Sequence, residues 1–494
     1  MSKAHKAFFI FFAAFLQIFF NSSNSGAQSF EASIKIETNA GPLASVSGRN
    51  LVANVNAGKR HVSFLRSNIG AENLGDRVSD LILLDRNGKQ VAYKKFIAGE
   101  FVAEADFTAW SYKIRLEMPK NPKAAAHISW LSTDTGILML NDLLPQLSEN
   151  GEMLSAKITL EIPDGWQIAA GEKVTEKHFD VSDTEKKVFV IGKDMRERRI
   201  EMGRFNLNLL TIGEWQFSDE EAAKTASEIY EEYLKIYGKT PSQTAQISIL
   251  KFPDNVSPGT WEAETRGSSV TIISSDMPFK TQSLQRLREQ MRHELFHLWL
   301  PGGVNLSGNY DWFFEGFALY QSLKTGVQLN QIRFDDFLDT LSRAHNIDSL
   351  QTRRLSLIEA SVNRWNGADT QVYARGMLVA FLCDIALLNE SKGKRSVSDI
   401  FRRVFEKHSF PGERQDGNAA VLSIMQADPE LLPIIQEYVK GAGKIDWQTQ
   451  LQTAGIESGP GNKRTSLHII EKPKKNQKAL LDKLGYNSWR KLSR

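Results

Sequence analysis

The sequence predicts a multidomain α+β protein, and three observations indicate this class. Polar and apolar residues alternate in many short segments up to about Leu210, as in half-buried strands. A capping box at 218–221 then opens a helix, and strand-like segments follow it. From Trp312 to about Tyr438 the pattern is helical almost throughout. We therefore expect a signal peptide at residues 1–27 and a β domain of sandwich or saddle type at 28–213. A domain that combines a small sheet with helices should follow at 214–345, then a helical domain at 346–460 and a basic tail at 461–494.

Turn residues separate the strands expected in the β domain. Segments 81–84 and 91–93 flank Asn87-Gly88, a pair typical of hairpin turns. The histidines of this region are widely spaced and lack the spacing of a metal site, so we interpret them as ordinary core or surface residues; they are His61, His127 and His178.

Composition and the N-terminus indicate an exported soluble protein. Among 494 residues, 24% are charged and the formal net charge is +3, a balance that does not suggest nucleic-acid binding. Lys3 and Lys6 precede an apolar segment at 7–20, and Ser25-Gly26-Ala27 offers a cleavage site. That segment is short for a membrane span. We expect a periplasmic or secreted protein with no stable span after cleavage, and an uncleaved N-terminal anchor stays open as the alternative.

Cysteine content and the C-terminal segment carry little chemistry. Cys383 is the single cysteine, so no intramolecular disulfide can form, and its apolar neighbours predict a buried small hydrophobe. Residues 463–494 hold ten Lys or Arg against two acids, Glu471 and Asp482. Such a basic segment is typical of a solvated, flexible tail.

The stretch from Met291 to Trp299 contains the pattern H-E-x-x-H, formed by His293, Glu294 and His297. Residues four apart lie on one face of an α-helix, so both imidazoles can bind one metal ion. Glu294 lies beside that metal, where it can polarise a bound water. Because the pattern occurs by chance in on the order of one chain in a hundred of this length, a second signal is needed.

That signal is the downstream stretch DWFFEGFALY at 311–320. A catalytic zinc site needs three protein ligands and one open position. His293 and His297 supply two, and Glu315 can supply the third from a second helix. An unpaired carboxylate among apolar and aromatic neighbours is costly to bury, and a metal partner explains it. We expect one Zn²⁺ per chain, bound by His293, His297 and Glu315.

These motifs resemble those of the gluzincin metallopeptidases, which include thermolysin and the aminopeptidase N family. The pattern is H-E-x-x-H followed by W-x-x-E-G-F-A-x-Y. The stretch YARGMLVAFLCD at 373–384 is similar to a motif of the glycyl aminopeptidase family, which is the closer match. The resemblance extends more weakly over residues 100–455. It implies a thermolysin-like catalytic domain at 214–345, completed by the helical domain, and action on peptide or protein substrates.

The resemblance also implies roles for three further residues. In aminopeptidase N-type enzymes the tyrosine of the matching motif stabilises the oxyanion, and Tyr373 stands there. A strand before the zinc helix pairs with the substrate and carries a Glu that binds the free α-amine. Glu264 aligns with that Glu best, Glu262 is the alternative, and side chains two apart share one face of a strand. A solvated edge strand without a substrate role stays open as well.

One position departs from the thermolysin pattern. Leu319 stands four residues after Glu315, where thermolysin has an Asp. An acid that would orient the His ligands is therefore absent at this position, and another group must do so.

The predicted reaction is hydrolysis of a peptide bond by a zinc-activated water. Glu294 acts as the general base and passes the proton to the leaving amine, and Tyr373 donates to the oxyanion. An aminopeptidase is the preferred interpretation. A catalytically inactive secreted binding protein on a peptidase scaffold and a zinc endopeptidase or amidase are the alternatives.

Overall fold

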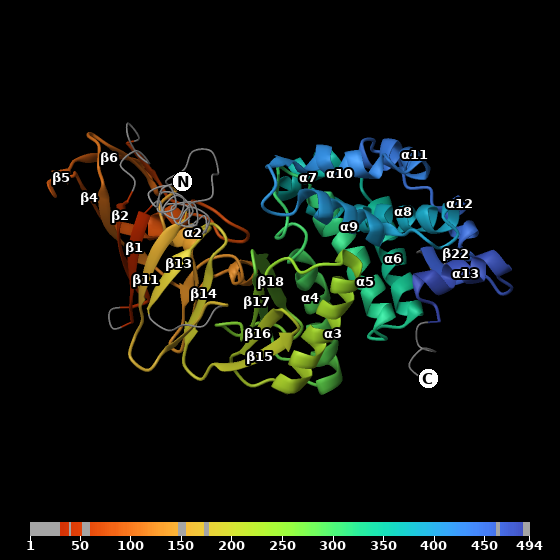
Figure 1. Ribbon diagram of the computed structural model, residues 1–494, viewed down its shortest axis with the longest axis horizontal. Coiled ribbons are helices and arrows are strands. Elements are labelled where there is room, and N and C mark those ends of the chain that lie inside the picture. The colour runs from red at the N-terminus through yellow and green to blue at the C-terminus, as the bar shows by residue number, and fades with distance from the viewer. Residues whose placement is uncertain are drawn as a thin grey trace, which may run out of the picture. The chain divides into compact units, whose positions relative to one another are not determined.

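The computed structural model describes residues 30–38, 41–51, 60–146, 155–171, 177–460 and 465–487. The predicted signal peptide lies outside these residues. The chain forms two compact units, and Figure 1 shows strands throughout the first and helices dominating the second. Residues 1–124, 128–169 and 173–193 make up the first unit, and residues 125–127, 170–172 and 194–494 the second. The multidomain α+β class is confirmed.

The first unit is built from three β-sheets. The largest has the strand order β13-β11-β1-β2-β8-β4-β5, in which only β1 and β11 pair in parallel. Its strands are β1 (Phe30–Glu37), β2 (Leu43–Asn50), β4 (Val78–Leu84), β5 (Gln90–Val91), β8 (Ala109–Arg115), β11 (Ala156–Glu161) and β13 (His178–Val181). A second sheet comprises β9 (Trp130–Leu131), β10 (Thr135–Met139), β12 (Gln167–Ala169) and β14 (Val188–Gly192). A third comprises β3 (His61–Ser63), β6 (Tyr93–Ile97) and β7 (Glu100–Ala103).

In the strands of this unit, the alternation of apolar and polar residues in the sequence matches an alternation of buried and more exposed side chains. Ile34, Val46 and Ile114 are almost fully buried, while their neighbours in the strands are more exposed. The predicted hairpin is confirmed, because β4 and β5 pair antiparallel around a turn in which Gly88 has a φ of 77°. Only glycine adopts that φ without strain.

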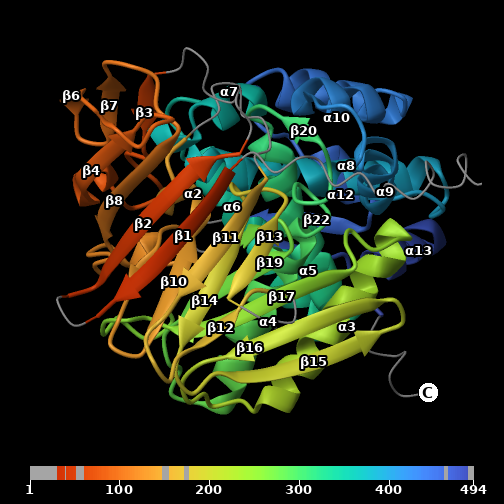
Figure 2. The same cartoon turned by 60° about the vertical axis from the view of Figure 1, so that its left-hand side comes forward.

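The second unit contains a five-stranded sheet of order β15-β16-β17-β19-β18, so β18 is an edge strand. Its strands are β15 (Arg196–Met202), β16 (Phe205–Thr211), β17 (Thr244–Lys251), β18 (Trp261–Arg266) and β19 (Ser269–Ser274). Figure 2 shows β15, β16, β17 and β19 side by side. The units divide before β15, earlier than the boundary predicted at residue 214. Pairing explains the difference, since β16 joins β17 in parallel and carries β15 with it.

Two long helices pack beside this sheet (Figure 1). In α3 (Asp219–Tyr237) the predicted capping box is confirmed, because Ser218 and Glu221 exchange hydrogen bonds. Every residue of α4 (Lys280–His297) from 290 onward is buried. Aromatic contacts join the two helices, with the rings of Tyr233 and Phe296 5.9 Å apart. The sequence H-E-x-x-H is therefore enclosed in the core.

The remaining chain is mainly helical. It comprises η3 (Trp312–Phe317), α5 (Ala318–Gln328), α6 (Phe334–Ser349), α7 (Leu357–Val362), η4 (Arg364–Asn366), η5 (Gln371–Arg375), α8 (Gly376–Glu390), α9 (Val397–His408), α10 (Gly417–Met425), η6 (Pro429–Leu431), α11 (Leu432–Ile434), η7 (Ile435–Val439) and α12 (Gln448–Thr453). The predicted division at 345 is not seen, because this part shares one apolar core with α3 and α4.

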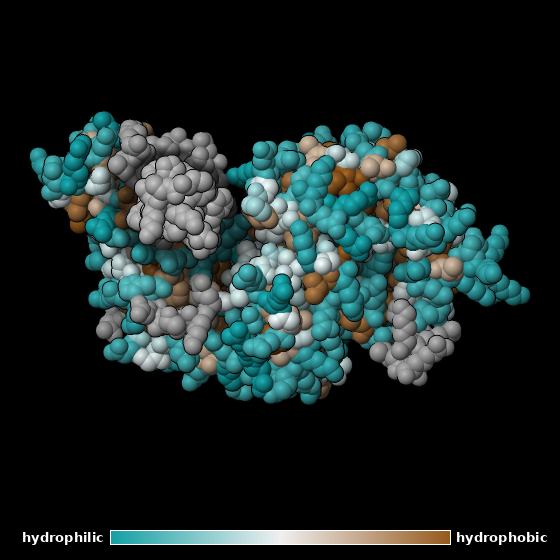
Figure 3. All heavy atoms as spheres, in the orientation of Figure 1, coloured by the Kyte–Doolittle hydropathy of each residue, from teal (hydrophilic) through white to brown (hydrophobic). Residues whose placement is uncertain are grey.

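Among the described residues, one helical run, at 371–390, is long and apolar enough to cross a membrane. However, 89% of its apolar window is buried, as in a core helix. Cys383 lies in this run and is fully buried, as predicted, and burial raises the pKa of its thiol. On the face shown in Figure 3, hydrophilic residues predominate and hydrophobic residues form small patches.

The prediction of a flexible basic tail is wrong for most of that segment. Strands β22 (Ile456–Pro460) and β23 (Thr465–Ile469) form an antiparallel pair, and helix α13 (Lys475–Leu484) follows. Apolar side chains spaced among the lysines join the main core, namely Leu467, Leu480, Leu481 and Leu484. Amphipathic spacing, rather than net charge, decides the structure here.

Candidate metal centre

Three predicted ligands meet in the core of the second unit. His293 and His297, one turn apart on α4, point their Nε2 atoms at each other across 3.1 Å. The Oε2 atom of Glu315 lies 3.2 Å from Nε2 of His293 and 3.5 Å from Nε2 of His297. Among the described residues, these three form the one group of histidine and acidic side chains arranged to hold a metal ion.

The geometry of this group fits zinc. Bonds of about 2.0–2.1 Å in a tetrahedral site require ligand atoms about 3.3–3.4 Å apart, close to the three distances found here. Oε2 of Glu315 is buried without a hydrogen-bond partner in the described part of the chain. A buried carboxylate oxygen in that state is costly unless a cation binds it. His297 also donates from Nδ1 to the carbonyl of Leu300 at 2.9 Å, which leaves Nε2 free for a metal.

The electrostatics of the group favour a cation. Burial lowers the pKa of His297, but the Glu315 carboxylate outweighs burial and raises that pKa to about 9. Burial in turn raises the pKa of Glu315, but the two histidines and Arg364 outweigh it and bring that pKa well below its usual range. The negative potential that would hold a proton between these groups can equally hold a metal ion.

Two glycines bring the downstream motifs to the centre. Glu315 lies in η3 and Tyr373 in η5, and both segments are π-helical turns, a form frequent at functional sites. A Cβ on Gly316 would lie 2.6 Å from the Cα of Gly376, and one on Gly376 would lie 2.8 Å from the Cα of Gly316. The two backbones touch where any side chain would separate them. The glycines of the E-G-F and Y-A-R-G motifs therefore fix how η3 and η5 meet.

Tyr373 lies beside this group, as predicted. Its ring centroid is 6.5 Å from that of His293, and its hydroxyl accepts a hydrogen bond from Nη2 of Arg364 at 2.6 Å. Burial raises the pKa of Tyr373 well above its usual value, and the Glu315 carboxylate raises it further. The phenol therefore keeps its proton at neutral pH and can act as a donor.

Glu294 lies on the same helix and contacts the edge strand. The hydroxyl of Thr265, on β18, lies 2.7 Å from Oε2 of Glu294 and 3.0 Å from its backbone carbonyl. Glu294 is only 4% exposed. A hydrogen bond from a neutral donor fixes the orientation of the carboxylate without neutralising it.

The two predicted substrate-binding acids share one face of β18, as expected from strand alternation. Glu264 accepts from Nδ1 of His127 at 2.8 Å and pairs with Nε of Arg266 at 2.9 Å. Glu262 lies 3.8 Å from Nε2 of the same histidine. Burial lowers the pKa of His127, but both carboxylates outweigh burial and raise it to about 9. His127 is therefore protonated at neutral pH and pairs with Glu264 as a cation.

Sequence reasoning missed three residues that contact the predicted site. His127 has no ligand spacing, and only folding brings it to β18. Thr265 follows Glu264 directly, so the strand pattern could have placed it on the opposite face, toward α4. Arg364 has no sequence signal, although it contacts both Glu315 and Tyr373.

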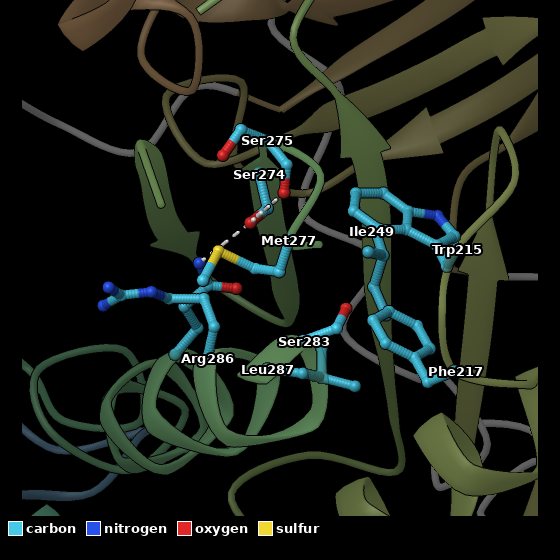
Figure 4. A pocket seen from close by; sticks show the side chains of 10 residues that line it. Trp215, Phe217, Ile249, Ser274, Ser275, Met277, Ser283, Arg286 and Leu287 are labelled. Atoms are coloured by element: carbon cyan, nitrogen blue, oxygen red, sulfur yellow. Dashed lines mark hydrogen bonds between the residues drawn. The ribbon is translucent and has the colours of Figure 1, made fainter. Parts of the chain in front are cut away.

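A small pocket lies elsewhere in the second unit, as Figure 4 shows. It lies next to β17, β19 and the first turns of α4, where Gln290 donates to Ser274. None of the predicted site residues lines it, so it adds nothing to the metal centre.

Solved structures match this fold. No family model matches the sequence, and no curated protein matches it. An aminopeptidase N family protein from Idiomarina loihiensis is 15% identical with a TM-score of 0.71, over 87% of this chain and 79% of that one. An M1 zinc metallopeptidase from Deinococcus radiodurans is 12% identical with a TM-score of 0.54, over 85% of this chain and 94% of that one. The chain has the M1 metallopeptidase fold.

A mutant of the Deinococcus enzyme bound to a Tyr-Ser-Ala substrate is similar to the same degree, with 13% identity and a TM-score of 0.54. At these identities the likeness establishes the M1 fold alone.

Proposed function

We propose that this protein is a zinc-dependent metallopeptidase. The observation that carries the proposal is the buried, unpartnered Oε2 of Glu315 facing the Nε2 atoms of His293 and His297. The fold supports it, because solved structures that share it are described as zinc metallopeptidases. Glu294, directly after the first ligand, supplies the base that hydrolysis needs.

Zinc, when bound, would lower the pKa of a water and polarise the scissile carbonyl. Glu294 removes the proton of the attacking water and delivers it to the leaving amine. The Thr265 hydroxyl, 2.7 Å away, holds the carboxylate in one orientation during both transfers. Burial of the α4 end excludes bulk water from this proton path.

Tyr373 supplies the second stabilising group in this proposal. Its hydroxyl accepts from Arg364, which leaves its own proton to be donated elsewhere. A neutral phenol is a suitable donor to the oxyanion that develops on the scissile carbonyl. The high pKa of Tyr373 keeps that proton in place at neutral pH.

We propose further that the substrate is a peptide with a free N-terminus, which would make the enzyme an aminopeptidase. Glu262 and Glu264 support this, since they project from the edge strand that contacts Glu294 through Thr265. Glu264 already pairs with His127 and Arg266, so Glu262 has more capacity left for an α-ammonium group.

Metal analysis combined with paired peptides tests both levels of the proposal. We expect about one zinc per chain and hydrolysis of N-terminally free peptides. Acetylating the N-terminus of a good substrate should reduce its cleavage by tenfold or more. Equal cleavage of acetylated peptides would reject the aminopeptidase assignment and indicate an endopeptidase. A folded protein that binds no zinc and cleaves no peptide would reject the metallopeptidase itself and indicate a binding protein.

We also propose that the protein is exported, because its first residues have the composition of a signal peptide. Fractionation of cells that express the full chain tests this. The expected product lies outside the cytoplasm and begins near Gln28. A product that keeps residues 1–27 and sediments with membranes would indicate the uncleaved anchor.

A further inference from the structure

Arg364 joins the metal ligand to the tyrosine. It lies in η4, the short turn between α7 and η5, and is 8% exposed. Its Nη1 donates to Oε1 of Glu315 at 3.2 Å, and its Nη2 donates to the hydroxyl of Tyr373 at 2.6 Å. One rigid guanidinium therefore contacts two groups on different π-helical turns.

Further contacts hold the guanidinium itself. Nη1 donates to Oδ1 of Asp311 at 2.7 Å, and Nε to Oδ1 of Asp369 at 3.3 Å. The guanidinium carbon lies 4.4 Å from the ring centroid of Trp365 and 5.1 Å from that of Tyr373. Cations are attracted to aromatic faces at these distances. Arg364 thus has little freedom to move away from either partner.

We propose that Arg364 is a positioning residue that sets how Glu315 binds the metal and where Tyr373 points its proton. The inference rests on the proposed function and extends it to a residue outside every motif.

The first half of the role concerns the two oxygens of Glu315. Oε1 is engaged by Arg364, whereas Oε2 faces both histidines without another partner. A carboxylate with both oxygens free can bind a metal through both. With Oε1 held by Arg364, Oε2 would be the oxygen of Glu315 that remains available to a bound metal, and a water could occupy the remaining position.

The second half concerns the proton of Tyr373. The phenol oxygen accepts from Nη2, so its own proton must point away from Arg364. Without this donor the hydroxyl would rotate freely about its C–O bond. Arg364 therefore restricts the directions in which Tyr373 offers its proton.

Two substitutions separate this role from simple packing. R364Q removes the charge and the fork of donors, and R364K retains the charge with one donor centre. We expect R364Q to lower kcat about tenfold to a hundredfold with KM within threefold, since small misplacements at a reacting centre cost that much. R364K should recover only part of that loss.

Cobalt substitution provides a readout that needs no substrate. The visible absorption of Co²⁺ is strong in four-coordinate sites and weak in five- or six-coordinate ones. We expect Co²⁺-loaded R364Q to absorb markedly less than the Co²⁺-loaded wild type, because both oxygens of Glu315 then bind. An unchanged spectrum would overturn the first half of the role.

A double-mutant cycle tests the second half. Y373F should cost much less kcat in the R364Q background than in the wild type, because the phenol no longer donates to the substrate there. Equal costs in both backgrounds would overturn this half. If R364Q does not fold, the same cycle is made with R364K, which must then show the same non-additivity in smaller measure.

A control removes a partly exposed ion-pair cluster of the same unit. Arg395 pairs with Asp428 and with Glu430, and nothing places it near the metal ligands. R395Q should lower the melting temperature yet keep the cobalt spectrum and KM of the wild type. If the wild type binds zinc but cleaves no peptide, the proposed function fails while the cobalt comparison still decides the first half of the role.

Discussion

The candidate metal ligands and the acids of β18 both include carboxylates with limited exposure, yet they differ in what their oxygens contact. Oε2 of Glu315 has no hydrogen-bond partner among the described residues. The carboxylate of Glu264, in contrast, is satisfied by His127 and Arg266. Oε1 of Glu315 is held by Arg364, but Oε2 faces only the two imidazoles, whereas both oxygens of Glu264 are engaged by cationic side chains.

This difference means that the candidate metal ligands and the acids of β18 support their proposed roles to different degrees. A buried polar atom without a partner is costly, so its persistence implies a ligand. An acid that is paired within the protein needs no ligand to explain it. The geometry of the three candidate ligands therefore supports a metal site by itself. For β18, a substrate role is supported only by the position of the strand and by the remaining hydrogen-bonding capacity of Glu262.

Replacing Glu294 gives the largest expected effect. E294Q removes the base while keeping the size of the side chain, so hydrolysis should fall about 10²- to 10⁴-fold. Zinc content should stay near one per chain, because Glu294 is not among the three metal ligands. E289Q, on the same helix but half exposed, is the control and should act like the wild type. Full activity of E294Q would contradict the mechanism.

The contact between two glycines should be nearly as sensitive. In G316A the new Cβ would lie 2.6 Å from the Cα of Gly376, so η3 and α8 must move apart. We expect zinc affinity to fall at least tenfold and kcat about a hundredfold, since Glu315 and Tyr373 separate. Competition with a chelator measures the affinity. G412A, whose Cβ would meet nothing closer than 3.3 Å, is the control. Unchanged zinc binding in G316A would show that the contact is not needed.

His127 tests whether β18 is held by its own cation. Folding raises the pKa of His127 from 6.5 to about 9, so its charge stabilises the fold below pH 6.5 and this stabilisation is lost as pH rises through 9. Denaturant unfolding should find zinc-loaded H127Q less stable than the wild type by on the order of 2–3 kcal/mol at pH 6, and by much less at pH 9.5.

His468 offers the control for that measurement, since its ion pair with Glu457 is about half exposed. H468Q should change stability little at any pH, because exposed pairs contribute little. A stability loss in H127Q that is the same at pH 6 and pH 9.5 would mean that His127 is neutral in the folded protein.

The acids of β18 give the smallest expected effects. E262Q should raise KM for N-terminally free peptides about threefold to tenfold, which corresponds to the net contribution of one ordinary hydrogen bond. E264Q should change KM less, because Glu264 is already neutralised, and it should lower stability instead. Neither substitution should affect acetylated peptides. A larger KM effect in E264Q would assign the amine to Glu264 after all.

The sequence by itself predicted many of the elements and the three candidate metal ligands. Helical spacing places His293 and His297 together, and an acid among aromatic residues identifies Glu315. Strand alternation also put Glu262 and Glu264 on one face, and the capping box gave the start of α3. These are local patterns, and local geometry suffices to read them.

Only the tertiary structure decided the surroundings of these residues. Arg364, Thr265 and His127 lie far along the chain from the groups they contact, and no spacing rule links them. The basic C-terminal segment likewise folds because its leucines reach a core built by distant helices. Such contacts depend on where the backbones cross, as at Gly316 and Gly376, and a crossing is fixed by packing of the whole unit rather than by neighbouring residues.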